Sequence, residues 1–195
     1  MPDGTTTTTS GNTVTNVAAG KPKIGGALYI GPTTATMPTD ATTALGTDFK
    51  CLGYISEDGL TNASEKESQV IKAWGGDPVV FVDNGQSDSF KFKLLEVLNL
   101  EVLKLVYGSA NVTGSLSAGI AVAVKGAPEN AAHALVAELV LRGAVKRIVV
   151  PFFYVTTVAE IVYRDNEAVG YDTTIAALPD SDGNTHYEYI KGAST

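Results

Sequence analysis

Apolar and polar residues alternate along several short segments of this chain, which is the pattern of strands with one buried face. Residues 87–97 are the clearest case, because Phe90 and Phe92 fall on one side and Lys91 falls on the other. Further strands are predicted at residues 25–30, 50–56, 69–74, 78–83, 119–125, 145–150, 171–178 and 185–190. Turns rich in Gly, Pro, Asp and Asn separate them. The pattern predicts a mainly β fold, either a β-sandwich or a barrel-like domain.

One helix is expected among these strands, after residue 99. Asn99 is a good N-cap, and Glu101 follows in the first turn, where the helix dipole favours a carboxylate. Gly108 is suited to end the helix. A single short helix of this kind is expected to flank the sheet and cover its open face.

Two segments leave their structure open to interpretation. Residues 131–141 have a helix-forming composition, yet they precede Arg142-Gly143 and a β-branched run at 145–150, which reads equally as a hairpin. The strand is favoured, partly because of a family resemblance described below. Pro151 then predicts that the second strand ends there or lies at a sheet edge, because proline cannot donate a ladder hydrogen bond.

The chain divides into an N-terminal arm, residues 1–23, and one β domain, residues 24–195. The arm is rich in Thr, Gly and Asn and has little apolar bulk, so it is expected to be flexible or to order only against a neighbouring subunit. Within the domain, residues 33–48 form an inserted loop. A long hairpin is expected over residues 51–83, with the polar segment 61–69 at its mobile tip.

Composition excludes several functions. The net charge is −7, which disfavours a protein that grips nucleic acid, because phosphate contacts need Lys and Arg. Cys51 is the sole cysteine, so an intrachain disulfide and a cysteine-based zinc site are excluded. The sequence starts without a signal-peptide pattern, and no apolar run reaches the roughly 18 residues of a membrane helix. Synthesis in the cytoplasm and no membrane partner are therefore expected.

No catalytic residue, cofactor or metal site is expected. Asp180–Asn184 starts like a calcium loop, but its glycine lies at the fourth position instead of the sixth, and a turn explains it better. His133 and His186 have no second His or Cys at ligand spacing. Glu57 and Asp58 are neighbours, whose side chains diverge on a strand. Neither a nucleophile elbow nor a phosphate-binding glycine loop occurs in the sequence.

Four segments of the chain resemble one known family. They are Phe49–Thr61, Ile71–Asp77, Glu101–Gly108 and residues 162–180. Together they resemble the tail tube, or major tail, proteins of phages with long, non-contractile tails. The matches occur in order between Ala27 and Ile190, and their specificity lies in this joint occurrence, since none is a chemical motif.

The resemblance implies a β-sandwich with one flanking helix that forms hexameric rings. The rings would stack into a hollow tube, similar to the type VI secretion tube, in the tail of the virion. The implied partners are copies of the chain itself, the tape-measure, terminator and distal tail proteins, and double-stranded DNA that passes through the lumen without specific binding. We also hypothesise that the excess carboxylates lie partly on the lumen surface.

Residues of the two most characteristic segments are the candidates for an assembly interface. They are Gly53, Glu57, Asp58, Gly59, Trp74, Gly75, Gly76 and Asp77. Trp74, the only tryptophan, would be a core anchor in a monomer or would occupy a neighbour's pocket in an assembly. Residues 33–48 and 56–69 would be the movable parts that lock one ring to the next.

Two other classes of protein remain as alternatives. One is a monomeric β-sandwich binding module, of the carbohydrate-binding or adhesin type, with tyrosines as its ligand platform. The other is a ring-forming tail terminator or capsid accessory protein, which would form single rings instead of tubes.

Overall fold

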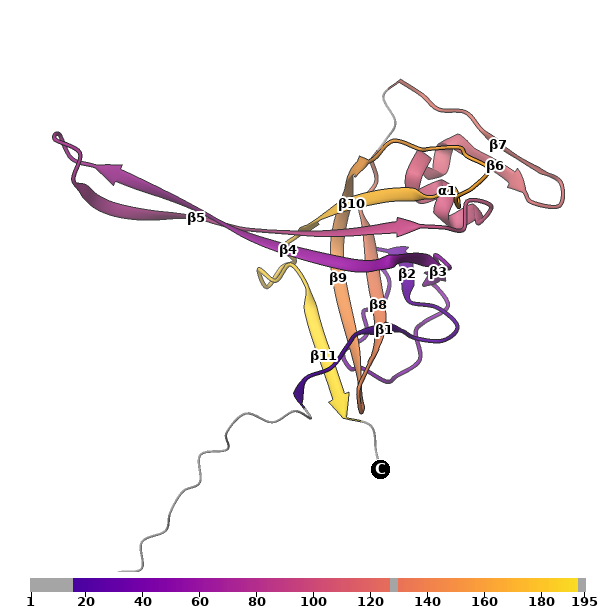
Figure 1. The fold of residues 1–195 in the computed structure, drawn as a ribbon, viewed down its shortest axis with the longest axis horizontal. Coiled ribbons are helices and arrows are strands. Elements are labelled where there is room, and N and C mark those ends of the chain that lie inside the picture. The colour runs from indigo at the N-terminus through magenta and orange to yellow at the C-terminus, as the bar shows by residue number, and fades with distance from the viewer. Residues whose placement is uncertain (1–15, 127–129, 193–195) are drawn as a thin grey trace, which may run out of the picture.

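The computed structural model describes residues 16–126 and 130–192, which are mainly β with one α-helix (Figure 1). The strands are β1 Lys21–Pro22, β2 Leu28–Pro32, β3 Lys50–Cys51, β4 Ile55–Lys72, β5 Pro78–Leu94, β6 Val112–Ser115, β7 Gly119–Val122, β8 His133–Leu141, β9 Ala144–Val158, β10 Tyr171–Leu178 and β11 Tyr187–Gly192. The helix α1 spans Leu100–Tyr107, and the 3-10 turn η2 spans Ser109–Asn111. The predicted class, a mainly β sandwich-like fold with one flanking helix, is confirmed.

Nine of the strands form one antiparallel sheet with the order β3-β2-β8-β9-β10-β5-β4. The other two of the nine strands lie off this path: β1 pairs with β8 beyond the end of β2, and β11 pairs with the first half of β9, whereas β10 pairs with its second half. The long strand β9 therefore belongs to two parts of the sheet, which we call its arms. Its first half pairs with β11 in one arm, and its second half pairs with β10 in the other arm, which continues to β5 and β4. In Figure 1 these arms run in clearly different directions, with β9 and β11 crossing the direction of β4 and β5.

The main core lies where the two arms of the sheet face each other, beside α1. Its largest fully buried apolar side chains are Phe90, Phe92, Phe153, Leu28, Leu52, Leu94, Leu135 and Ile175. The helix contributes Val102, Leu103 and Leu105. In β5 the buried phenylalanines alternate with the exposed Lys91, as the sequence pattern predicted.

A second, smaller core lies on the opposite face of the sheet, under the loop that follows β2. Phe49, Val136 and Val149 are buried there, and Met37 and Leu45 from the loop pack against them. Both faces of β8 and of the middle of β9 are therefore covered.

This double coverage explains why residues 131–141 were ambiguous in the sequence. Ala134–Glu138 of β8 are all buried, so the strand shows no alternation of apolar and polar residues. The segment His133–Leu141 is a strand, as favoured over the helix.

The helix α1 has the termini that the sequence predicted. The Asn99 side-chain oxygen accepts a hydrogen bond from the backbone N–H of Glu101 at 3.0 Å. The Asn99 amide also donates to the backbone oxygen of Cys51 at 3.3 Å. At the other end Gly108 has a φ of +88°, and its N–H donates to the backbone oxygen of Lys104 at 2.9 Å. Asn99 thus caps the helix and ties it to β3.

The prediction that a strand ends or lies at an edge at Pro151 is wrong. The strand β9 runs through this residue as a central strand. Pro151 lies where β9 changes neighbours, because β11 pairs up to Val149 and β10 begins at Phe152. Toward β8 the register shifts between His133 and Leu135, so Pro151 also lies at an irregularity of that ladder. A proline inside a sheet is tolerated at such a site.

The prediction of a mobile tip at residues 61–69 is also wrong. These residues lie inside β4, where Thr61 pairs with Lys91 and Gln69 pairs with Val82. The actual turn is Ala73–Asp77, between two of the longest strands. From Thr61 onward every residue of β4 is exposed, so both faces tolerate polar residues and residues 61–69 lacked the alternation that would have marked them as a strand.

Replacement of Asn99 by Ala should lower the free energy of unfolding by about 1 kcal/mol, because the helix loses its side-chain cap. Urea denaturation of the purified protein measures this change. Asn99→Ser keeps an oxygen that can accept the hydrogen bond from Glu101, and should lose clearly less stability. Equal stability of the Ala variant and the wild type would contradict the capping role.

Candidate assembly surface

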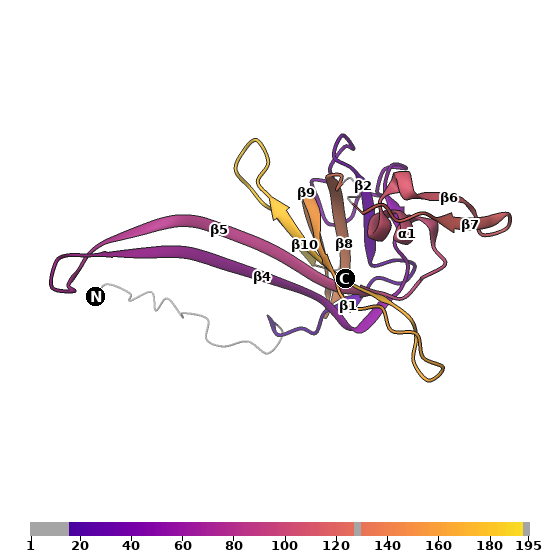
Figure 2. The same ribbon diagram turned by 90° about the horizontal axis from the view of Figure 1, so that it is seen from above.

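The candidate interface residues lie at opposite ends of the β4–β5 hairpin. Gly53 and the run Glu57–Gly59 lie at its root, and Trp74–Asp77 form its tip. Figure 2 shows the hairpin projecting far from the body of the domain. The 17 residues of β5 correspond to a length of about 55 Å. Within one chain, the structure therefore keeps the two groups of residues apart.

The tip is a tight turn that presents Trp74 to solvent. The N–H of Ala73 donates to the backbone oxygen of Asp77 at 2.8 Å, and the N–H of Gly76 donates to that of Ala73 at 2.9 Å. Gly75 and Gly76 have φ values of +114° and +97°, which residues with a side chain rarely adopt. Trp74 is fully exposed, at 107%. Its interpretation as a core anchor of the monomer is therefore wrong.

Exposed apolar side chains surround this tip on the distal half of the hairpin. They are Val70, Ile71, Trp74, Val79, Val80 and Phe81. The strand β10 pairs with β5 only from Asp88 to Leu94, so the distal half is a ribbon of two strands with both faces exposed. An isolated two-stranded ribbon is marginally stable, and an exposed apolar surface of this kind marks an interaction site.

The root of the hairpin contains a bulge that carries the two adjacent carboxylates. The ladder between β4 and β5 passes from Ile55 directly to Leu60, so Ser56–Gly59 have no partners in β5. Glu57 and Asp58 are exposed there, and the glycine of this bulge has a φ of +73°. Bulges often re-aim side chains at functional sites. The two carboxylates face solvent, not a cleft.

A pocket of about 500 Å³ lies next to this root. One wall is formed by Cys51, Gly53 and Ile55, and another by the strap, which we define as residues 22–27. Ile24 of the strap is fully exposed. Tyr54, another lining residue, is 78% exposed. The pocket thus has apolar groups facing solvent, a feature that sequence reasoning missed.

Glu96 forms the polar side of the pocket. Its carboxylate accepts hydrogen bonds from the backbone N–H of Tyr54 and from the side chain of Asn99, both at 3.1 Å. Gly53 lies so close that an added Cβ would be 1.9 Å from the Glu96 carboxyl carbon. A side chain at position 53 would therefore displace the Glu96 carboxylate, and the φ of +77° also favours glycine there.

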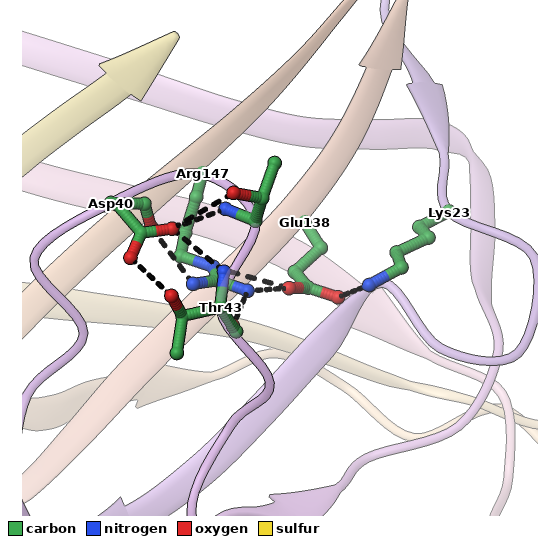
Figure 3. Close-up of polar contacts among 6 residues, drawn as sticks. Lys23, Asp40, Thr43, Glu138 and Arg147 are labelled. Carbon is green, nitrogen blue, oxygen red and sulfur yellow. Dashed lines mark hydrogen bonds and ion pairs between the residues drawn. The ribbon is translucent and has the colours of Figure 1, made fainter. Parts of the chain in front are cut away.

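A buried ion pair holds the strap and the loop of residues 33–48 against the sheet (Figure 3). Arg147 is 1% exposed and donates to the Glu138 carboxylate, with Nε at 3.1 Å. It also donates to the backbone oxygens of Asp40 and Thr43, both at 2.8 Å. The second oxygen of Glu138 accepts from Lys23 of the strap at 2.6 Å. One pair of side chains thus fixes two segments that are distant in sequence.

This network changes the interpretation of two segments. Arg147 holds the loop of residues 33–48, and Met37 and Leu45 of this loop pack against the smaller core. We therefore do not retain the hypothesis that this loop is a movable part that locks one ring to the next. Residues 16–23 of the predicted arm are described, and Lys21–Pro22 pair with β8 as β1. Residues 1–15 lie outside the described part of the chain.

Titratable groups elsewhere form structural contacts. Asp88 is buried and accepts a hydrogen bond from Thr185, with His186 Nδ1 3.5 Å away. Burial opposes ionisation of Asp88, but its hydrogen bonds and His186 lower its pKa overall. Burial lowers the pKa of His133.

In the described residues no three His, Cys, Asp or Glu side chains are grouped to hold a metal ion, and no helix is long and apolar enough to cross a membrane.

Open strand edges and an exposed apolar hairpin are typical of the class of structural proteins that associate with other molecules through a β-sheet. The comparison with known families gives its identity more narrowly: the chain belongs to the phage tail tube protein family, whose model matches residues 11–194. No curated protein sequence matches the chain. It is accordingly a structural subunit of a phage tail and a component of the virion.

Replacement of Glu138 by Gln should destabilise the protein by about 3 kcal/mol at pH 7, because Arg147 loses its buried partner. Burial alone would raise the pKa of Glu138, but hydrogen bonds from Lys23 and Arg147 lower it below its ordinary 4.5. The wild type therefore gains stability from this carboxylate above pH 4.5 and loses it as the pH falls through the lowered pKa. The difference in the free energy of unfolding between the wild type and Glu138→Gln should therefore become smaller as the pH falls below 4.5.

Urea denaturation between pH 7 and pH 3 measures this difference. Glu160→Gln is a matched control, because Glu160 is exposed, and it should change stability by less than about 0.5 kcal/mol. A gap between wild type and Glu138→Gln that stays constant over the whole range would contradict the ionised pair.

Proposed function

We propose that six copies of this chain form a ring and that rings stack into the hollow tail tube through which viral DNA is delivered. The observation that supports this most is the distal hairpin, whose apolar side chains are exposed and are not covered by a second layer of the described chain. In a tail tube subunit the natural partner is a second copy. The proposed tube is that of a phage with a long, non-contractile tail and is related to the type VI secretion tube.

Pairing between sheet edges supports the closure of a ring. The strand β4 ends the sheet, so one side of its backbone has no neighbour among the described strands. Soluble proteins usually block such an edge, whereas addition of a strand from another molecule satisfies its N–H and C=O groups. An edge that pairs with a different edge of the next copy makes a heterologous contact, which closes into a ring or continues as a filament.

The face of the sheet opposite the main core is our candidate for the lumen surface. Its side chains on β4, β5 and β10 include Thr61, Ala63, Glu65, Glu67, Ser87, Ser89, Lys91, Lys93, Asp172, Thr174, Ala176 and Leu178. This face carries three carboxylates, from Glu65, Glu67 and Asp172, and two amines, from Lys91 and Lys93, so its charges nearly balance. We therefore propose a nearly neutral lumen, in place of the acidic one hypothesised from composition.

The two ends of such a tube would present different surfaces. One end would expose hairpin tips and the other would expose hairpin roots, because the hairpins project from the body in one direction (Figure 2). Terminator and distal tail proteins would bind these different ends, and the tape-measure protein would occupy the lumen before DNA. Synthesis would take place in the cytoplasm of the host.

Negative-stain electron microscopy over a concentration series tests the proposed function. Hollow tubes of uniform width and six-fold end views are expected. Isolated rings that do not elongate at any concentration would favour a terminator-type protein. Monomers at all concentrations would contradict self-assembly and favour a monomeric binding module.

Replacement of Phe81 by Asp should leave the monomer intact but weaken assembly. Phe81 is 76% exposed, so the change should alter the free energy of unfolding by less than about 0.5 kcal/mol. In the tube the new charge would be buried without a partner, which should raise the critical concentration for assembly at least about tenfold. Sedimentation of assembled protein measures this concentration.

Leu116→Asp is the matched control for this variant. Leu116 is 64% exposed in the connection between β6 and β7, which lies on the far side of the body from the hairpin tip (Figures 1 and 2). The Leu116→Asp variant should have the same critical concentration for assembly as the wild type. Unimpaired assembly of Phe81→Asp would show that the distal hairpin is not an interface.

A further inference from the structure

We propose that Trp74 of one copy inserts into the pocket at the hairpin root of a second copy. This inference rests on the proposed function, because it assigns the contact partner of the hairpin within the tube. The pocket and the tryptophan are separate features of one chain. Their chemistry and their positions relate them to each other.

The pocket is suited to an aromatic side chain. Its volume of about 500 Å³ lies within the range of pockets that bury small organic groups. Its apolar lining includes Pro22, Ile24, Tyr54 and Ile55. Because Ile24 is fully exposed in the single chain, an occupant would bury an apolar side chain that now faces solvent.

The polar side of the pocket matches the single donor of an indole. Tryptophan is apolar except for its ring N–H, which needs an acceptor when it is buried. The Glu96 carboxylate accepts two hydrogen bonds at present, from Tyr54 and Asn99. A carboxylate has about four acceptor positions, so Glu96 can accept a further bond from the indole of Trp74.

The charges beside the tip and the pocket are also complementary. Lys72 and Asp77 flank Trp74 at the tip. Glu96 lines the pocket and supplies the charge opposite to Lys72, whereas Lys23 of the pocket wall is already paired with Glu138. Such pairs at the rim of an interface fix orientation more than they add affinity.

The positions of the two features make the contact intermolecular and repeating. The tip and the pocket lie at opposite ends of a hairpin about 55 Å long, so a chain cannot fill its own pocket. Each copy therefore offers one tip and one pocket to two different neighbours. Such a head-to-tail contact continues from copy to copy, as the axial contacts of a tube must.

Cysteine cross-linking tests the contact, because the sole native cysteine, Cys51, lines the pocket. Assembled Trp74→Cys protein is oxidised and separated on a non-reducing gel. A ladder of covalent oligomers is expected, since every chain carries one cysteine at the tip and one in the pocket. Trp74→Cys with Cys51→Ser can form only tip-to-tip dimers, and should lose the ladder.

Fluorescence of the unaltered tip gives an independent measurement. Trp74 is the only tryptophan, so a blue shift and protection from acrylamide on assembly should report its burial. Ile24→Asp places a charge in the pocket and should abolish both changes, whereas Leu116→Asp should keep them.

These experiments separate the inference from the proposed function. Tubes that give no ladder, or Ile24→Asp tubes in which Trp74 is buried as in the wild type, would overturn the pocket contact and leave the tube intact. Absence of assembly in the wild type would instead overturn the proposed function.

Discussion

A two-stranded ribbon cannot bury its own apolar side chains, because neither of its faces has a second layer opposite it. The distal half of the β4–β5 hairpin is such a ribbon, and it carries Trp74, Phe81 and several aliphatic residues. Its backbone hydrogen bonds are satisfied between the two strands, but its apolar surface is not covered. The favourable free energy of burying this surface is therefore available only on association with another molecule. Under the proposed assembly, the open sheet edge and the pocket at the hairpin root would supply that association.

The direction of the hairpin is set by the core, because β5 belongs to both. Its second half contributes Phe90 and Phe92 to the main core, and its first half forms the projecting ribbon. Asp88 lies at the transition, where Thr185 and His186 contact its buried carboxylate. At the root, the Arg147–Glu138 pair holds the strap that walls the pocket. Such fixed attachments reduce the entropy that the hairpin and the pocket would lose on binding.

The features that the sequence predicted correctly are those that depend on interactions between residues close together in the chain. Asn99 and Gly108 end the helix through bonds to nearby residues, and β10 alternates because only one of its faces is buried, so both were predictable. The Gly75-Gly76 turn was likewise visible, although the exposed apolar residues beside it resembled core residues. The passage of β9 through Pro151 and the Lys23–Glu138 contact, between residues 115 positions apart, depend on which segments become neighbours in space. The sequence pattern of one segment does not show which distant segment will lie beside it, so neither feature could be predicted.

The candidate lumen face suggests how a tube could conduct DNA without retaining it. Affinity for the phosphate backbone grows with the number of free Lys and Arg side chains, because each contact releases counterions. On this face Lys91 is paired with Asp172 at 3.1 Å, and Lys93 lies opposite the same aspartate in the strand register. Most of the other positions carry hydroxyl or methyl groups. A paired amine offers less charge to a phosphate than a free one, while a strongly acidic wall would oppose the approach of DNA. A nearly neutral wall of small side chains avoids both effects, so a tube of this kind needs no specific contact with its cargo.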